Sequence, residues 1–177
     1  MGGFWSEIVD DHTGPPLTDE MIEEAESTLG YKLPVAYLRL VRIRNGGYPL
    51  KFCFPTTTPT SWAIDHIQIS TLFGVGSTWG IGKSPKIIRE RGYPDVGIVI
   101  ADTPSGCDDA VMLDYRECGP DGEPRVVYVE AFGSAAATIL APDFESFVSG
   151  LVDGSEFEDE EPPPWNSREA KSDSEES

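Results

Sequence analysis

The chain has 177 residues and carries 31 acidic against 13 basic side chains, a formal net charge of −18. This length fits one folded domain, since domains mostly contain roughly 100–200 residues. The charge argues against direct binding of nucleic acid, which needs clustered Lys and Arg side chains, and against an anionic membrane surface for the same reason.

The N-terminus shows no basic stretch followed by an apolar run, so the sequence predicts no signal peptide. No segment approaches the roughly 18 apolar residues of a membrane span, and we expect a cytoplasmic protein. The cysteines are Cys53, Cys107 and Cys118, without Cys-x-x-Cys spacing. Neither a disulfide framework nor a zinc ribbon is indicated, and free thiols are expected in a reducing compartment.

Two helices are predicted near the N-terminus. Thr18 is a candidate N-cap before an acidic first turn, and Gly30 a candidate stop because glycine tolerates the left-handed backbone. A second helix begins with proline at Pro34 and ends at the Asn-Gly-Gly of residues 45–47.

Strand patterns dominate the rest of the chain until a last helix capped by Asp143. Helices followed by strands and one more helix indicate an α+β domain with a mainly antiparallel sheet flanked by helices. Gly-Pro-Asp-Gly at 119–122 predicts that the last two strands form a hairpin. Extended segments are expected at 50–54, 64–72, 97–101, 110–115 and 125–132, a short helix at 86–91, and a glycine-rich loop at 74–82.

The C-terminal residues 153–177 carry ten acidic and two basic side chains, with three consecutive prolines. Such a segment cannot bury enough apolar surface to offset its chain entropy, so we expect a disordered acidic tail. Trp165 either anchors a short linear motif there or has no role. The predicted organisation is an N-terminal extension over 1–16, a folded domain over 17–152 and the tail over 153–177.

Three motifs in the first half occur in a recognisable order. They are Leu29-Gly30 at the end of the first helix, then Leu33-Pro34, then Asn45-Gly46-Gly47. This pattern resembles the opening of the SUKH superfamily, in the Smi/Knr branch named after a fungal regulator of cell-wall synthesis. Residues 98–102 and 105–115 look like the central strands of that family, 119–128 like its next hairpin and 144–151 like its closing helix. The resemblance covers residues 18–152.

The resemblance implies an α+β fold and a role in protein binding. Many bacterial members look like immunity proteins that neutralise polymorphic toxins by direct contact, and eukaryotic relatives look like interaction hubs. The family is not known for catalysis. Related sequences often carry Gly-His where this chain has Cys107-Asp108, which puts in doubt any role that needs an imidazole there.

Acidic residues gather on and between two predicted adjacent strands. Asp102, Asp108, Asp109 and Asp114 could serve turn geometry and solvation, form an acidic surface for a partner, or hold a metal or act as acid and base. Asp114 is expected to face outward, because Val111 and Leu113 would point into the core.

Two tryptophans, Trp62 and Trp79, bracket the glycine-rich region. Exposed, they would be candidate binding anchors, since aromatic residues dominate interface hot spots; buried, they belong to the core. A nucleophile–histidine dyad would need His12 or His66, which lie in a predicted loop and near a predicted strand start. We predict no catalytic residue, no metal site and no cofactor.

The leading hypothesis is a non-enzymatic immunity protein that neutralises a basic toxin domain, such as a nuclease, by steric and electrostatic coverage. Contacts are expected from an exposed face of the sheet and the loops around Trp62 and Trp79, together with the four aspartates. The alternative is a regulatory or scaffold module that acts through its acidic tail, with Ser172, Ser174 and Ser177 as phosphorylation targets. A third hypothesis is an enzyme that uses Asp102, Asp109 or Asp114.

Overall fold

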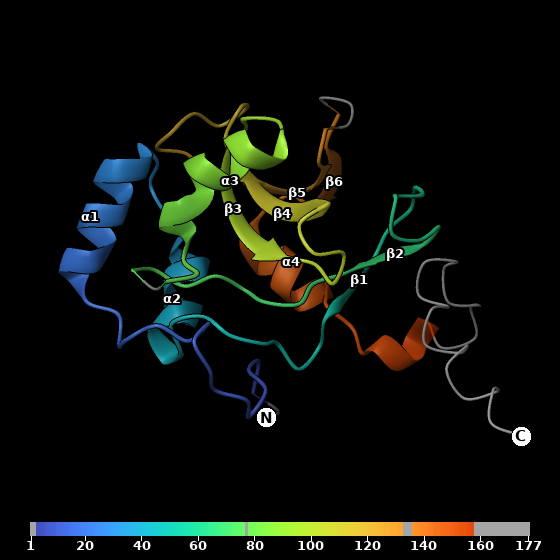
Figure 1. Cartoon of the computed structure of the whole chain (residues 1–177), viewed down its shortest axis with the longest axis horizontal. Coiled ribbons are helices and arrows are strands. Elements are labelled where there is room, and N and C mark those ends of the chain that lie inside the picture. The colour runs from blue at the N-terminus through green and yellow to red at the C-terminus, as the bar shows by residue number, and fades with distance from the viewer. Residues whose placement is uncertain (1–2, 77, 133–135, 158–177) are drawn as a thin grey trace, which may run out of the picture.

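A computed structural model of the chain describes residues 3–76, 78–132 and 136–157. It contains four α-helices, two antiparallel sheets and two short 3₁₀ helices (Figure 1). In chain order the elements are α1 (Asp19–Leu29), α2 (Val35–Ile43), β1 (Cys53–Pro55), β2 (His66–Gln68), η1 (Ile81–Lys83), α3 (Ser84–Arg91), β3 (Gly97–Asp102), β4 (Asp109–Asp114), β5 (Arg125–Glu130), β6 (Thr138–Ala141), α4 (Phe144–Gly150) and η2 (Gly154–Phe157). The predicted α+β fold with a mainly antiparallel sheet is confirmed.

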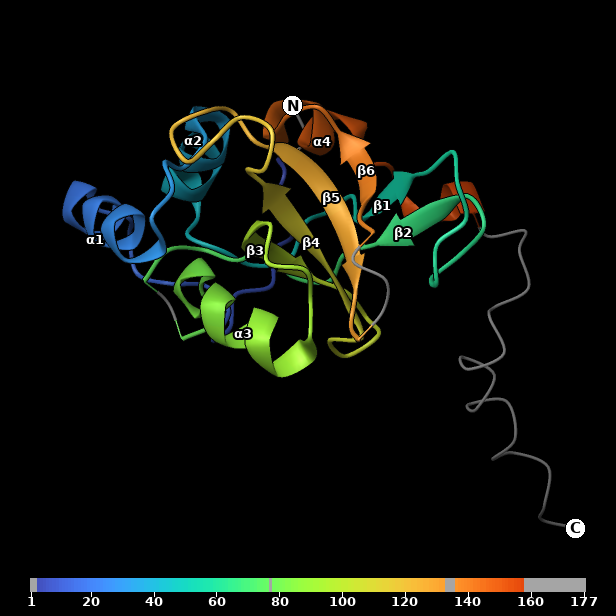
Figure 2. The same cartoon turned by 90° about the horizontal axis from the view of Figure 1, so that it is seen from above.

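The larger sheet has the strand order β3-β4-β5-β6, and every neighbouring pair is antiparallel. Helices α2 and α4 lie side by side on one side of this sheet and α3 on the other (Figure 2). Helix α1 and the β1–β2 ribbon lie at opposite ends of the molecule (Figure 1). The ribbon pairs through Cys53↔Gln68, Phe54↔Ile67 and Pro55↔His66.

The helix boundaries follow the local signals in the sequence. The Thr18 hydroxyl accepts a hydrogen bond from the Met21 amide at 3.3 Å, and Gly30 ends α1 with φ of +79°. The Asp143 carboxylate caps α4 by accepting from the Ser146 amide at 2.7 Å. Pro34 lies one position before α2, at its N-cap.

The central strands are buried on both faces, which contradicts the expectation of an exposed sheet face. All six residues of β4 are buried, and so are the middle four of β5. The run Val126 to Val129 is apolar without alternation, as expected for a strand buried on both faces. Helices cover the sheet on both sides (Figure 2). Any accessible binding surface therefore belongs to the turns, helices and loops around the sheet.

The outer strands differ most from the sequence-based expectation. The extended segments predicted at 50–54 and 64–72 form strands of three residues each, β1 and β2. Strand β6 was not predicted, because its four residues carry no alternation and stand next to a run of alanines. The Lys86–Arg91 helix is present and begins two residues earlier, at Ser84.

The N-terminal extension and the chain after α4 also contact the rest of the domain. The Ser6 amide donates to the Tyr48 carbonyl and the Leu50 amide to the Phe4 carbonyl, both at 2.8 Å. After α4, the Val152 amide donates to the Cys53 carbonyl at 2.8 Å, and the Phe157 ring stacks on His66 with 4.0 Å between centroids. The tail expected from residue 153 lies, beyond residue 157, outside the described residues.

Candidate partner-binding surface

The six residues singled out in the sequence lie in three separate places. Asp108, Asp109 and the loop that holds Trp62 meet at the end of the sheet formed by the β3–β4 turn. Trp79 and Asp102 belong to a cluster around His12. Asp114 lies at the opposite end of β4.

Asp109 is buried and organises a network of hydroxyl groups at the turn end of the sheet. Its carboxylate accepts hydrogen bonds from the hydroxyls of Thr103 and Tyr128 and, at 2.7 Å, from Ser105. The Tyr128 hydroxyl also contacts the Ser61 hydroxyl at 2.8 Å. With 3% of its surface exposed, Asp109 cannot offer a carboxylate to a partner. It positions the turn instead.

The loop that precedes β2 packs against this network. The Ser61 amide donates to the Glu130 carboxylate at 3.0 Å, and the Trp62 amide donates to the Thr60 hydroxyl at 3.2 Å. Trp62 itself is half-buried. Segments far apart in the sequence, 60–62, 103–109 and 128–132, thus form one end of the molecule.

Asp108 and its neighbours carry the accessible part of that end. Asp108 is exposed, and its carbonyl accepts the Ala131 amide at 2.7 Å. Phe132 follows with φ of +49° and 79% of its surface exposed, and Cys107 has φ of +81°. These are the two non-glycine residues with left-handed backbone in the described chain, a conformation that costs an L-residue about 1–2 kcal/mol.

The Phe132 ring has a defined position although it is exposed. The Phe132 amide donates to the Arg91 carbonyl at 3.2 Å, so this backbone is tied to the end of α3. A Cβ atom added at Gly92 would come within 2.7 Å of the Phe132 ring, so the ring lies on the bare backbone of that glycine. We name the exposed residues Asp108, Phe132, Arg91 and Gly92, together with the half-buried Ala131, the turn-end surface.

A second surface gathers around His12. The Asp10 carboxylate contacts His12 Nδ1 at 3.0 Å and accepts the Tyr48 hydroxyl at 2.7 Å. The Trp79 ring stacks on His12 with 5.8 Å between centroids, and Lys83 Nζ lies 5.0 Å from the Trp79 ring centre. Trp79 is 48% exposed. The N-terminal extension therefore contributes two polar groups to this cluster.

Charges in the His12 cluster are held by hydrogen bonds and partial burial. The hydrogen bond from Tyr48, with one from the His12 amide, lowers the pKa of Asp10. The same bond to Asp10 raises the pKa of Tyr48. Burial raises the pKa of Asp102, whose carboxylate accepts the Thr71 amide at 2.8 Å. Asp102 thus supports the loop at Thr71 more than it presents charge.

Asp114 does not face outward as expected. It is 1% exposed, and its two oxygens receive the Arg116 guanidinium at 3.0 and 2.8 Å and Arg125 Nε at 2.9 Å. Arg125 comes from β5, directly across the β4–β5 pair. The carboxylate is buried because two arginines satisfy it, and it is unavailable to a partner.

Among the described residues, no hydrogen bond or ion pair joins either histidine to a cysteine. Cys53 is fully buried, and burial raises the pKa of its thiol to about 11. His66 contacts Asp65 at 2.7 Å, whereas His12 contacts Asp10. Across the described ranges, no group of three His, Cys, Asp or Glu side chains is placed to hold a metal ion, and no helix is long and apolar enough to cross a membrane.

The order of helices, central strands and closing helix agrees with one known family. Residues 19–148 match the model of SUKH_6, the SMI1-KNR4 cell-wall family. The chain belongs to this family. The resemblance read from the sequence is thereby confirmed, and no curated protein matches the chain. SUKH domains occur in immunity proteins and in Smi1/Knr4-type proteins, and they are protein-interaction modules.

Sequence reasoning did not single out the most exposed aromatic side chain of this SUKH domain. Phe132 was placed at the end of a predicted strand, where an aromatic residue is normally half-buried. Its exposure results from the left-handed turn after β5, and no local sequence motif predicts that turn. Tyr48 and Asp10 were missed for a related reason, because their contact joins segments 38 residues apart.

Proposed function

We propose that this SUKH domain is an immunity-type protein that binds and covers a toxin domain through its turn-end surface, without catalysis. The observation that carries the proposal is Phe132, an aromatic side chain held at 79% exposure on a left-handed backbone. Membership of the family supports a binding role. The net charge of −18 favours a basic partner, such as a nuclease domain.

The position of Phe132 is typical of an interface anchor. Burying a phenylalanine side chain contributes about 1.5–3 kcal/mol, which the free protein forgoes here while also carrying an unfavourable backbone conformation. A hydrogen bond from the Phe132 amide to the Arg91 carbonyl fixes the backbone, and the ring lies against Gly92. A partner therefore meets a side chain that loses little freedom on binding.

Long-range electrostatic attraction would raise the association rate more than the affinity. An acidic protein attracts a basic partner over a Debye length of about 8–10 Å at physiological salt, which raises the association rate. The exposed Asp108 beside Phe132 places one negative charge at the anchor itself. We expect the association rate to fall with added salt. A rate independent of salt would exclude electrostatic steering but not binding through the turn-end surface.

The test is a growth assay in which a toxin encoded beside this gene is expressed with the protein, together with co-purification of the pair. Phe132→Ala should weaken binding by at least tenfold and reduce protection. Ile8→Ala is the matched control, since Ile8 is 61% exposed on a distant segment. If the wild-type protein neither binds nor protects, the immunity role fails; if Phe132→Ala binds like Ile8→Ala, the turn-end surface is the wrong one.

A regulatory or scaffold role through the acidic tail is a second candidate, favoured by the ten acidic side chains from residue 153 onward. Deletion from residue 158 distinguishes the two, because it keeps the Phe157–His66 stack and removes eight of these ten acidic side chains. Function kept after this deletion supports the folded domain as the binding unit. Function lost after it supports the tail.

A further inference from the structure

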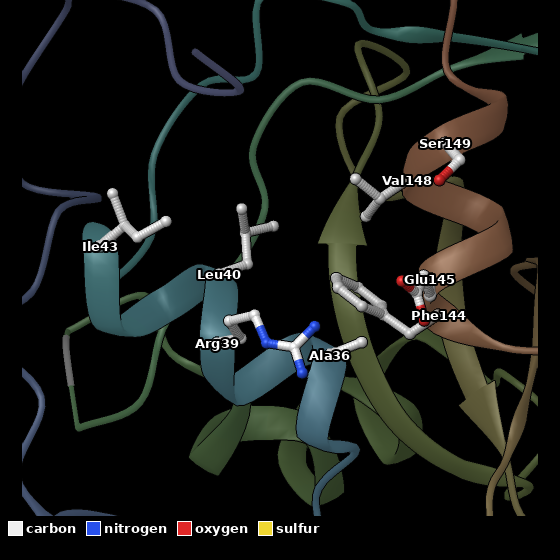
Figure 3. A pocket seen from close by; sticks show the side chains of 8 residues that line it. All are labelled: Ala36, Arg39, Leu40, Ile43, Phe144, Glu145, Val148 and Ser149. Carbon is white, nitrogen blue, oxygen red and sulfur yellow. The ribbon is translucent and has the colours of Figure 1, made fainter. Parts of the chain in front are cut away.

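An apolar groove runs between α2 and α4, away from the turn-end surface. It encloses about 230 Å³ and is lined by Leu40 and Ile43 on α2 and by Phe144 and Val148 on α4. The apolar side chains point into the space between the helices (Figure 3). Ile43 is 75% exposed at one end of the groove.

The two sides of the groove carry opposite charges. Arg39 lies on α2 and Glu145 on α4, and both side chains line the groove (Figure 3). Within the described ranges neither makes a salt bridge, whereas Arg42, on the same helix as Arg39, pairs with Asp19. A matching occupant would have one large apolar group with a basic and an acidic side chain close beside it.

The sequence contains one such arrangement outside the described residues. In residues 158–177 the sole large apolar side chain is Trp165, and the two bases of this segment, Arg168 and Lys171, follow it within six residues. Arg168 and Glu169 stand three and four positions after Trp165, the spacing that places side chains on one side of a helical turn. We propose that residues 165–171 of this same chain occupy the α2–α4 groove, with Trp165 on its apolar floor, Arg168 at Glu145 and Glu169 at Arg39.

Chain length allows this contact. Nine residues join Val148 to Phe157, and four of them form η2, so the two are separated by at most about 26 Å. The eight residues from Phe157 to Trp165 span up to about 28 Å when extended. The linker can therefore reach the α4 side of the groove, and the contact is intramolecular.

A C-terminal segment bound in the groove would act as an internal ligand. Any partner that uses the α2–α4 surface must first displace residues 165–171. Phosphorylation of the serines that follow this segment would weaken its binding to the groove. The turn-end surface lies elsewhere and stays accessible. The proposal therefore does not depend on the immunity role.

The test uses the full-length chain labelled with 5-fluorotryptophan. Trp165→Ala identifies the Trp165 resonance in the ¹⁹F spectrum, and its shift between H₂O and D₂O reports exposure to solvent. We expect a smaller solvent shift for Trp165 than for free 5-fluorotryptophan. Ile43→Glu should bring it to the free value without unfolding the domain. Val9→Glu, at a residue 64% exposed on the N-terminal segment, should leave it unchanged.

A charge exchange tests the orientation of the segment. Glu145→Arg alone and Arg168→Glu alone should each raise the solvent shift of Trp165, and the double variant should restore it. A Trp165 with the free value in the wild-type chain, or one that Ile43→Glu leaves unchanged, overturns the proposal. A protected Trp165 whose signal depends on protein concentration also overturns it, because a second copy then fills the groove.

Discussion

Cys107 and Phe132 share the left-handed backbone conformation and lie at the same end of the sheet, connected through the hydrogen bond from the Ala131 amide to the Asp108 carbonyl at 2.7 Å. The two unfavourable backbones thus belong to two neighbouring turns, the one between β3 and β4 and the one after β5. Strain of this kind persists where the surrounding contacts fix it, and it concentrates at binding sites. Contacts of the surrounding fold therefore hold the unfavourable backbone that exposes Phe132.

Cys107→Gly should stabilise the protein. Glycine adopts φ of +81° without the Cβ clash, and after allowance for its greater freedom in the unfolded chain we expect a gain of about 0.5–1 kcal/mol. The family resemblance agrees, since related sequences often have glycine there. Urea denaturation measures the change. Cys118→Gly is the matched control and should destabilise the protein slightly, because Cys118 lacks the left-handed backbone. If Cys107→Gly lowers the free energy of unfolding as much as Cys118→Gly does, the strain argument is wrong.

Asn45→Asp should destabilise the fold strongly. The Asn45 amide nitrogen donates to the carbonyls of Pro15 and Val75 at 2.8 and 2.7 Å, and its oxygen accepts the Val75 amide at 2.7 Å. An aspartate of the same shape would face two carbonyls with no proton to donate. Because the site is 3% exposed, we expect a loss of about 2–4 kcal/mol in the free energy of unfolding.

The pH dependence of this variant checks the cause. Protonation of the new carboxyl returns one donor, so the loss relative to wild type should shrink as the pH falls. Asn45→Ala provides the comparison, since it should show no such pH dependence of its own. An Asn45→Asp protein within about 0.5 kcal/mol of wild type at neutral pH would rule out this hydrogen-bond account.

Tyr128→Phe should loosen the loop at the turn end of the sheet. The variant removes the hydroxyl that donates to buried Asp109 and contacts Ser61 at 2.8 Å, at a cost of about 1–3 kcal/mol. Hydrogen exchange at the Ser61 amide should accelerate, because its bond to Glu130 depends on the loop position. Tyr48→Phe, which removes an exposed hydrogen bond, should leave Ser61 unchanged. Equal exchange rates in the two variants would count against the network.

Local signals in the sequence predicted the helices and the central hairpin, because each depends on neighbours along the chain. Thr18, Gly30 and Asp143 mark helix ends by bonding to amides or carbonyls within four residues. The surface depends on distant contacts and could not be predicted in this way. Phe132 is exposed because α3 fixes its backbone, and Asp114 is buried because Arg125 reaches it across the sheet.

Asp114→Asn should destabilise the protein at neutral pH and lose this effect in acid. Burial alone would raise the pKa of Asp114, but the hydrogen bonds and charges of Arg116 and Arg125 outweigh it and lower the pKa to about 2 from an ordinary value of 3.8. A lowered pKa means that the ionised carboxylate stabilises the folded state above about pH 4. This contribution, about 2 kcal/mol, disappears as the pH falls through the folded pKa.

Urea denaturation of wild type and Asp114→Asn across pH 2–7 measures that difference directly. The gap between the two proteins should be largest at neutral pH and close between about pH 4 and pH 2, since protonated Asp114 resembles asparagine in charge. Glu117→Gln is the matched control: Glu117 pairs with the same Arg125 at 3.0 Å but is 76% exposed, so its loss should stay below about 1 kcal/mol. A constant gap at every pH would show that shape, and not charge, is what Asp114 supplies.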